Sequence, residues 1–162
     1  MRLSLPASRA EPLLRKMIAA GLHAADPCRM LLRAVAREGS VLWVGRRPYD
    51  LRRYERVLAV GAGKASAKLA RALERILGAR LEGGLVVVKA GHKEPTRRIT
   101  LVEAGHPVPD RAGLRAAERL RATVSELSDR DLLFVLLSGG ASSLLPAPAP
   151  GLTLADKQTT TK

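Results

Sequence analysis

Apolar positions recur along this chain at two spacings, and the spacing separates the predicted helices from the predicted strands. A helical period predicts helices over residues 11–24, 27–38, 64–77 and the stretch that follows Asp110. Short, largely apolar runs typical of buried strands cover residues 41–44, 56–60, 84–89, 98–104 and 131–137. The more polar residues 46–50 are predicted to form a turn.

Capping residues support the boundaries of these helices. Asp26, Asp110 and Thr153 each stand where a helical pattern needs an N-cap, because their side-chain oxygens can accept a hydrogen bond from the first turn. Glycine is the expected terminator of two of the helices, at Gly39 and Gly78. The pattern that follows Thr153 is therefore interpreted as one more helix.

From residue 56 onward, predicted strands alternate with predicted helices. This order is typical of an α/β domain with a largely parallel sheet sandwiched between helices. The link between the strands at 84–89 and 98–104 is too short for a full helical crossover. We therefore expect these two strands to be antiparallel or to lie apart in the sheet.

The composition of the 162-residue chain is that of a folded domain with a strong positive charge. Hydrophobic residues make up 46% of the chain, and the formal net charge is +13. A basic protein is expected to bind nucleic acid only where the charge is grouped and aromatic side chains can stack on bases. Here aromatic residues make up 2% and the arginines are scattered, so we expect solvated basic faces, some help for an anionic substrate, and no nucleic-acid partner.

The single cysteine and the short apolar runs exclude further classes of protein. Cys28 cannot belong to a disulfide framework or a cysteine metal cluster, and its isolation fits a reducing, cytoplasmic compartment. No apolar run approaches the length that a bilayer requires, so no membrane partner is expected.

The first candidate site is the glycine-rich turn "GAGKAS", which follows a predicted buried strand. Gly61 and Gly63 would let a phosphate approach the backbone, and Ser66 is a small third residue of a dinucleotide-type pattern. A P-loop is excluded, because the earlier glycine and the hydroxyl residue after Lys64 are both missing. A NAD site is disfavoured because the next strand ends in Lys89 rather than in an acidic residue. A plain tight turn between strand and helix stays an alternative.

Lys64 is unusual at the predicted start of a helix. A cation there faces the positive end of the helix dipole, which is unfavourable by a few tenths of a kcal/mol or more unless an anion lies nearby. The sequence therefore indicates a bound anion, although Lys64 also fits the head of a solvated basic stripe along the helix.

The second candidate site follows the last predicted strand. Ser138, Gly139, Gly140, Ser142 and Ser143 form a turn rich in glycine and hydroxyl groups, which suits a phosphate. The nucleophile elbow of hydrolases is absent, because a leucine stands where the elbow needs its second glycine. A simple glycine turn with a serine cap stays the alternative.

Two Gly-His pairs also follow predicted strands. His92 and His106 have no ligand-like spacing, so no metal site is predicted, and each is interpreted as a structural or substrate-contacting loop residue. Asp110 is interpreted as a helix cap rather than a catalytic acid.

Taken in order, these motifs resemble one family closely. The segments "VGAGKAS", "GLVVVKAGH", "EAGHPVPDRAG" and "LLSGGASSLLPAPAPGLTLADKQ" are similar to the N-terminal region of the glycerate 2-kinases of the two-domain class with a C-terminal MOFRL domain. One departure is Ala141, where members often have a third glycine. The resemblance implies a Rossmann-like fold, which would be incomplete at the C-terminus of this sequence.

The resemblance also implies an activity. Members transfer the γ-phosphoryl group of ATP to the 2-hydroxyl of D-glycerate, and Lys64 matches the family's active-site lysine. Magnesium would accompany ATP, and the two glycine-rich turns, with Gly61, Gly63, Ser66 and the serines and glycines of 138–143, would bind phosphate or glycerate oxygens. A homo-oligomer is left open. The alternative is a hydroxypyruvate reductase that uses NAD(P), a name that family members have carried.

By the same resemblance, residues 1–162 correspond to the N-terminal part of the large kinase domain, without the MOFRL domain. We therefore expect this polypeptide to be inactive on its own. We also expect apolar side chains that would meet later parts of the family fold to be exposed, at Leu144, Leu145, Leu152 and Leu154.

Overall fold

A parallel four-stranded sheet forms the centre of the computed structural model, which describes residues 10–162. Its strands follow the order β6-β5-β4-β7, and every neighbouring pair is parallel. Their bounds are β4 (Arg56–Ala62), β5 (Gly83–Lys89), β6 (Ile99–Ala104) and β7 (Asp131–Leu137). The largely parallel sheet expected from the sequence is confirmed.

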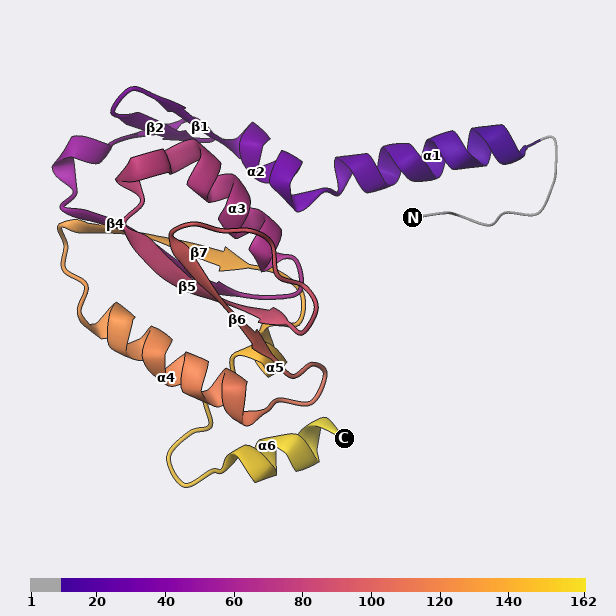
Figure 1. Ribbon diagram of the computed structural model, residues 1–162, viewed down its shortest axis with the longest axis vertical. Coiled ribbons are helices and arrows are strands. Elements are labelled where there is room, and N and C mark those ends of the chain that lie inside the picture. The colour runs from indigo at the N-terminus through magenta and orange to yellow at the C-terminus, as the bar shows by residue number, and fades with distance from the viewer. Residues whose placement is uncertain (1–9) are drawn as a thin grey trace.

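Helices cover both faces of this sheet (Figure 1). Helix α3 (Ser66–Leu77) packs on one face, where Leu73 and Leu77 lie in a buried cluster with Val57 and Val86. Helix α4 (Arg111–Ser125) and the short α5 (Ala141–Leu144) cover the other face around a second cluster. The predicted sandwich of helix, sheet and helix is therefore confirmed.

The order of the strands defines one special position at the edge of the sheet. Counted from β4, the order is third, second, first, fourth, which matches the first four strands of the dinucleotide-binding fold. The chain leaves β4 toward β5 on one side and later returns to β7 on the other side. A crevice outside the carboxyl ends of β4 and β7 is where open sheets of this kind bind ligands.

The expectation for β5 and β6 was wrong, because these strands are adjacent and parallel. Residues 90–98 make the return without a helix, and nine extended residues reach about 30 Å, more than the length of β6. The side chain of Glu74 on α3 accepts hydrogen bonds from the backbone N–H groups of Arg97, Arg98 and Ile99. A loop can serve as the crossover because α3 already covers this face of the sheet.

The N-terminal part differs from the prediction in two places. Helix α1 (Glu11–Ala24) is as expected, but α2 (Pro27–Ala34) ends four residues before the predicted bound. Residues 35–38 form a strand instead, and the predicted turn at 46–50 is mostly strand as well. Together they make an antiparallel sheet of β1 (Val35–Glu38), β2 (Val41–Val44) and β3 (Arg47–Asp50). Pairing with β2 overrides the local helical and turn patterns.

Capping confirms the helix starts that the sequence predicted. Asp26 and Asp110 accept hydrogen bonds from backbone N–H groups in the first turns of α2 and α4. Thr153 forms a capping box with Asp156 at the start of α6 (Leu154–Thr161). Two single 3₁₀ turns complete the set of elements, at Leu51–Arg53 and Gly78–Arg80.

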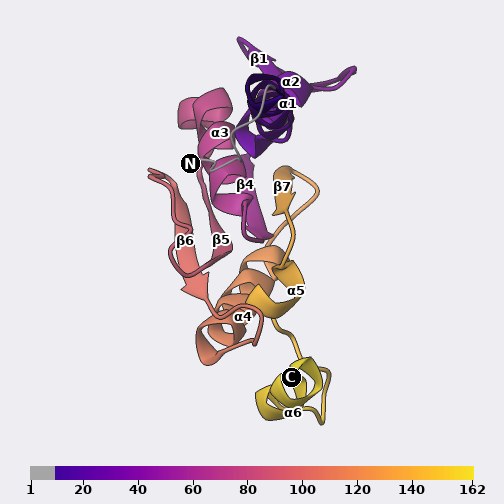
Figure 2. The same cartoon turned by 90° about the vertical axis from the view of Figure 1, so that its right-hand side faces the viewer.

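The two ends of the described chain lie away from the sheet. Helix α1 projects from the body, and α6 lies beyond α4 and α5 (Figures 1 and 2). One hydrogen bond joins α6 to the body, from the Gln158 side chain to the Pro109 carbonyl. The expectation that Leu144 is exposed was wrong, because this side chain is fully buried against β5. Leu152 is 60% exposed as expected, whereas Leu145 and Leu154 are only partly exposed.

Candidate functional site

Hydrogen bonds join the two glycine-rich loops at the carboxyl ends of β4 and β7. The N–H of Lys64 donates to the carbonyl of Gly139 at 2.9 Å, and the N–H of Ala65 donates to the Ser138 hydroxyl at 3.0 Å. The hydroxyl oxygens of Ser66 and Ser138 lie 3.0 Å apart. Several groups that the sequence suggested for a phosphate therefore hold the loops together.

Two glycines make this close approach possible. A Cβ built on Gly61, which lies inside β4, would collide with the backbone carbonyl of Leu136 in β7. Gly63 has a φ of +142°, which L side chains rarely adopt, and its Cβ would collide with Ser138. Because both glycines lack a side chain, β4 and β7 can approach closely. Both glycines and Ser66 are buried, so they are not open to a ligand.

The two loops, residues 61–66 and 138–143, meet at the carboxyl ends of β4 and β7, and we call this place the junction. Lys64 is exposed there. Helix α3 begins at Ser66 with Ala65 as its N-cap, so Lys64 lies two residues ahead of the helix rather than in its first turn. The stem of Lys64 passes beside Gly140, since its Cγ is 3.4 Å from the place that a Cβ on Gly140 would occupy. The Lys64 side chain is therefore exposed beside the second loop.

Histidines from the next two loops lie against the same junction. His92, which follows β5, has its Nδ1 3.2 Å from the Lys64 carbonyl oxygen. His106, which follows β6, packs on Gly140, where a Cβ would lie 2.9 Å from the ring Nε2. Gly140 has a φ of +91°, so both its conformation and its neighbours require glycine. The sequence had suggested a structural or substrate-contacting role for both histidines, and the signal was the repeated Gly-His pair after a strand.

The remaining residues of the second loop differ in what they offer. The Ser143 hydroxyl donates to the Gly140 carbonyl at 3.2 Å, so it stabilises the turn. Ser142 and Gly139 are exposed, and nothing lies within 4 Å of where a Cβ on Gly139 would be. Lys64, Gly139 and Ser142 are therefore the predicted site residues that stay open to a ligand.

Acidic groups are scarce around this junction. Glu103, in β6, accepts a hydrogen bond from the Gly91 N–H at 2.7 Å and lies 3.6 Å from the Lys93 ammonium. Asp110 accepts from Gly105 and Gly113, which confirms that it is a cap. Within residues 10–162, no three His, Cys, Asp or Glu side chains gather into a group that could hold a metal ion. The junction thus offers a cation, a hydroxyl group and two imidazoles, which together suit an anionic ligand.

Comparisons with known proteins identify similar chains. A family model described as "Domain of unknown function (DUF4147)" matches residues 13–162. A "Glycerate 2-kinase" from Pyrococcus horikoshii is 33% identical over 146 residues, which cover 90% of this chain and 32% of that protein. A crystal structure of glycerate kinase from Thermotoga maritima matches with a TM-score of 0.74 and 30% identity, covering 92% of this chain and 33% of the other.

A further relative carries a different name. A "Putative hydroxypyruvate reductase" from Agrobacterium vitis is 47% identical over 107 residues, 66% of this chain and 28% of that protein. The chain thus spans about a third of the length of the curated relatives it matches. None of the helices within residues 10–162 combines the length and the apolar character needed to cross a membrane.

Proposed function

The chain belongs to the family defined by the domain of unknown function DUF4147, and from that membership we propose that its sheet edge is the phosphate-handling part of a glycerate 2-kinase. The reaction transfers the γ-phosphoryl group of ATP to the 2-hydroxyl of D-glycerate and yields 2-phosphoglycerate. One observation carries the proposal: the exposed Lys64 stands at the switch point between β4 and β7, beside the open Gly139 and Ser142. The relatives named glycerate kinase support it.

The open residues have distinct roles in this proposal. Phosphoryl transfer needs positive charge near the moving group and little covalent chemistry from the protein. Lys64 supplies that charge, either to the transferring phosphoryl group or to the carboxylate of glycerate. Gly139 lets an oxygen approach the backbone, and Ser142 donates a hydrogen bond from its hydroxyl group.

The buried residues keep the open ones in place. Gly61, Gly63, Ser66 and Ser138 hold the two loops together. His92 and His106 border the junction from the loops after β5 and β6 and are positioned to limit the movement of the Lys64 and Gly140 backbone. We assign these six residues a positioning role, because none of them adds an open cationic group at the junction.

The described residues do not fit a magnesium site. Mg²⁺ prefers carboxylate and phosphate oxygens in octahedral geometry. Glu103 already interacts with Gly91 and Lys93, and Asp110 is engaged as a helix cap. We therefore derive no step from a metal held by residues 10–162.

The proposal is tested by titrating the chain with ATP and with D-glycerate while recording backbone amide NMR signals. We expect both ligands to shift the signals of residues 64 and 139–142, and the affinity at the junction is taken from these signals. Lys64→Ala should weaken binding of one of the two ligands by at least about tenfold, because it removes an exposed cation beside both loops. Lys16→Ala, which removes the same charge from an exposed position on α1, is the matched control and should change affinity by less than about twofold. Equal, small effects of the two substitutions would refute the role of Lys64.

The second candidate is a hydroxypyruvate reductase, favoured by the name of one relative. In that case the chain should bind NADH through the same junction. Lys89 ends β5, the strand next to β4, where a NAD site has an acidic residue on the ribose. NADH that competes with ATP for residues 139–142, and binds more tightly, would favour the reductase.

A further inference from the structure

Three shallow hollows follow one another along the solvent side of α3. The first has a volume of about 370 Å³ and is bordered by the Gly78–Ala79 turn and by Arg97 and Arg98. It shares Glu74 and Arg97 with a second hollow of about 420 Å³, and that hollow shares Arg71 and Arg75 with a third of about 300 Å³. Because neighbours share walls, the three form one groove between α3 and the crossover 90–98, which we name the α3 groove.

Positive charge dominates the α3 groove. Five of its lining residues are cationic: Lys68, Arg71 and Arg75 from α3, and Arg97 and Arg98 from the crossover. Three are acidic: Asp26, Glu74 and Glu94. The three cations of α3 lie between residues 68 and 75, and these seven residue steps correspond to about 10 Å of helix. The other two lie on the crossover.

Each of the three carboxylates already has a partner. Glu74 accepts from three backbone N–H groups of the crossover, and Glu94 pairs with Arg71 at 2.9 Å. Asp26 caps α2 and is 3.9 Å from the Lys68 ammonium. Among residues 10–162, no carboxylate forms an ion pair with the side chain of Arg75, Arg97 or Arg98. Three guanidinium groups therefore remain available to an anion.

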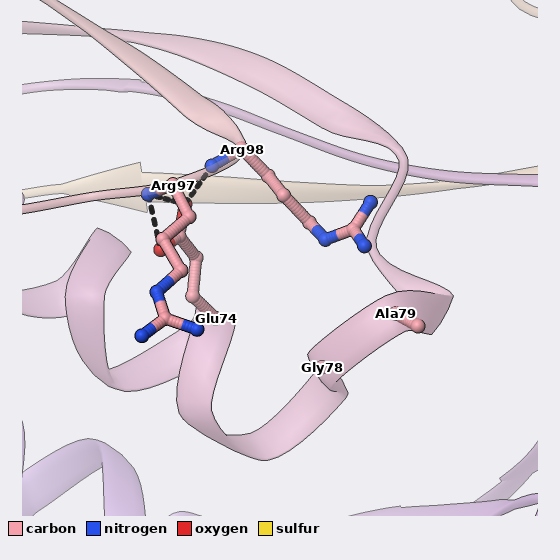
Figure 3. Close-up of a pocket in the computed structure, with 5 residues that line it drawn as sticks. All are labelled: Glu74, Gly78, Ala79, Arg97 and Arg98. Atoms are coloured by element: carbon pink, nitrogen blue, oxygen red, sulfur yellow. Dashed lines mark hydrogen bonds between the residues drawn. The ribbon is translucent and has the colours of Figure 1, made fainter.

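Figure 3 shows how two of these groups are arranged. The Arg98 side chain extends from the start of β6 across the space above Gly78 and Ala79, and the Arg97 side chain descends beside Glu74. Two guanidinium forks thus face one hollow from different sides, an arrangement suited to bidentate contacts with phosphate oxygens. The negative end of the α3 dipole opposes an anion here, but the Leu77 carbonyl is already bonded to Arg37.

We propose that the α3 groove is a second anion site that binds an oligophosphate chain. A linear ligand with several charges can contact all three unpaired guanidinium groups, whereas a lone carboxylate would meet only one or two of them. None of the residues that line the groove is aromatic, so it has no platform for stacking nucleic-acid bases. The groove is distinct from the proposed kinase junction, because Lys64 does not line it and Arg98 lies at the opposite edge of the sheet, before β6 begins.

Inorganic oligophosphate and the phosphate tail of a nucleotide share this chemistry. The experiment therefore uses calorimetric titration with sodium tripolyphosphate, ATP and AMP in separate arms. The background is Lys64→Ala, which removes the exposed lysine of the proposed kinase junction. Similar affinity for tripolyphosphate and ATP, with much weaker binding of AMP, would mean that only the phosphate chain is recognised. Binding of ATP alone would overturn the proposal, because it would require contacts with the base.

Matched charge changes locate the site. The pair Arg97→Gln and Arg98→Gln should weaken tripolyphosphate binding at least tenfold. The pair Arg119→Gln and Arg121→Gln removes the same charge from exposed positions of α4, on the other side of the sheet, and should weaken it less than threefold. Equal losses in both pairs would show that only the net charge matters, and no measurable binding by the folded background variant would also overturn the site.

A second measurement does not depend on how the variants fold. Tripolyphosphate added to the unsubstituted chain should shift backbone amide NMR signals over residues 71–79 and 94–99. Shifts confined to residues 64 and 139–142 would place the ligand at the proposed kinase junction alone and would overturn the α3 groove as a site. Because the two regions are separate, failure of one proposal leaves the other testable.

Discussion

At the scale of single residues, the two glycine-rich loops divide into residues that hold the loops together and residues that stay open. Ser138 serves the first purpose twice, as acceptor for the Ala65 N–H and as partner of the Ser66 hydroxyl. Lys64, Gly139 and Ser142 serve the second purpose, because they are exposed at the same edge of the sheet. Substitutions in the two groups should therefore have different consequences, one for stability and one for binding.

Gly61→Ala tests the first group. The added Cβ would collide with the Leu136 backbone, which can move only if β4 and β7 separate. We expect the free energy of unfolding, measured in urea, to fall by at least about 2 kcal/mol. Gly139→Ala is the control in open space and should change it by less than about 0.5 kcal/mol, while reducing ligand binding at the junction. A Gly61→Ala variant of unchanged stability would contradict the close packing of β4 on β7.

At the scale of elements, charged side chains form hydrogen bonds that join two pairs of elements. One joins β4 to β7, where Arg56 and Asp131 are register partners and form two hydrogen bonds of 2.9 and 2.7 Å. The other joins α3 to the crossover through Glu74. Each of these connections gives a prediction about stability.

The Arg56–Asp131 pair should make stability depend on pH in the acid range. The Arg56 guanidinium, and after it the Ser128 N–H, hold the pKa of the Asp131 carboxyl well below its ordinary value. Because the folded state has the lower pKa, this stabilisation is present above about pH 4, the ordinary value for Asp, and is lost as the pH falls toward the folded pKa. Asp131→Asn should lower the melting temperature at neutral pH and flatten its decrease below pH 4. Asp129→Asn, an exposed neighbour, should keep the steeper decrease of the unsubstituted chain.

Glu74→Ala should loosen the crossover between β5 and β6. It leaves three backbone N–H groups without their acceptor, one of them at the partly buried start of β6. We expect a loss of about 1 to 3 kcal/mol in the free energy of unfolding, and faster amide exchange over residues 96–99. Glu118→Ala, at an exposed position on α4, is the control and should stay within about 0.5 kcal/mol. Equal exchange rates at 96–99 in both variants would contradict the bridging role of Glu74.

At the scale of the whole molecule, large apolar side chains remain exposed on several elements, with α1 and β7 among them. Helix α1 presents Leu13 and Met17, each 62% exposed, and the edge strand β7 presents Val135 and Leu137, 57% and 61% exposed. Apolar patches and unpaired strand edges favour association with other chains. We expect these 162 residues to associate as their concentration rises, as measured by light scattering coupled to size exclusion. A monomer at all concentrations that also fails to bind a hydrophobic dye would contradict this.

Turnover is also a property of the whole molecule. The junction at β4 and β7 offers a cation and a hydroxyl group, but the chain spans about a third of the length of its glycerate kinase relatives. We expect these residues to bind ligand at the junction without releasing ADP in response to D-glycerate, as measured by a coupled assay of ADP. Steady ADP release that depends on both D-glycerate and Lys64 would show that this expectation is wrong.

Local features of the structure could be predicted from the sequence alone. The periods of helices and strands, the caps at Asp26, Asp110 and Thr153, and the positions of the two glycine-rich turns all depend on residues within a few positions of one another. The likeness of the motifs to a kinase family also rests on the sequence, since it compares the order of residues. These properties can therefore be predicted without knowing which strands pair.

Only the tertiary structure decided which distant residues meet. Strand pairing converted residues 35–38 and 47–50 from a predicted helix end and turn into β1 and β3, and it placed β5 and β6 side by side in parallel. In the folded chain, the Lys64 and Ala65 N–H groups donate hydrogen bonds to the second loop. His92 and His106 lie against the same junction. The physical reason is that a backbone N–H or a side chain takes the partner that the fold brings within reach, and the distance along the chain does not reveal that partner.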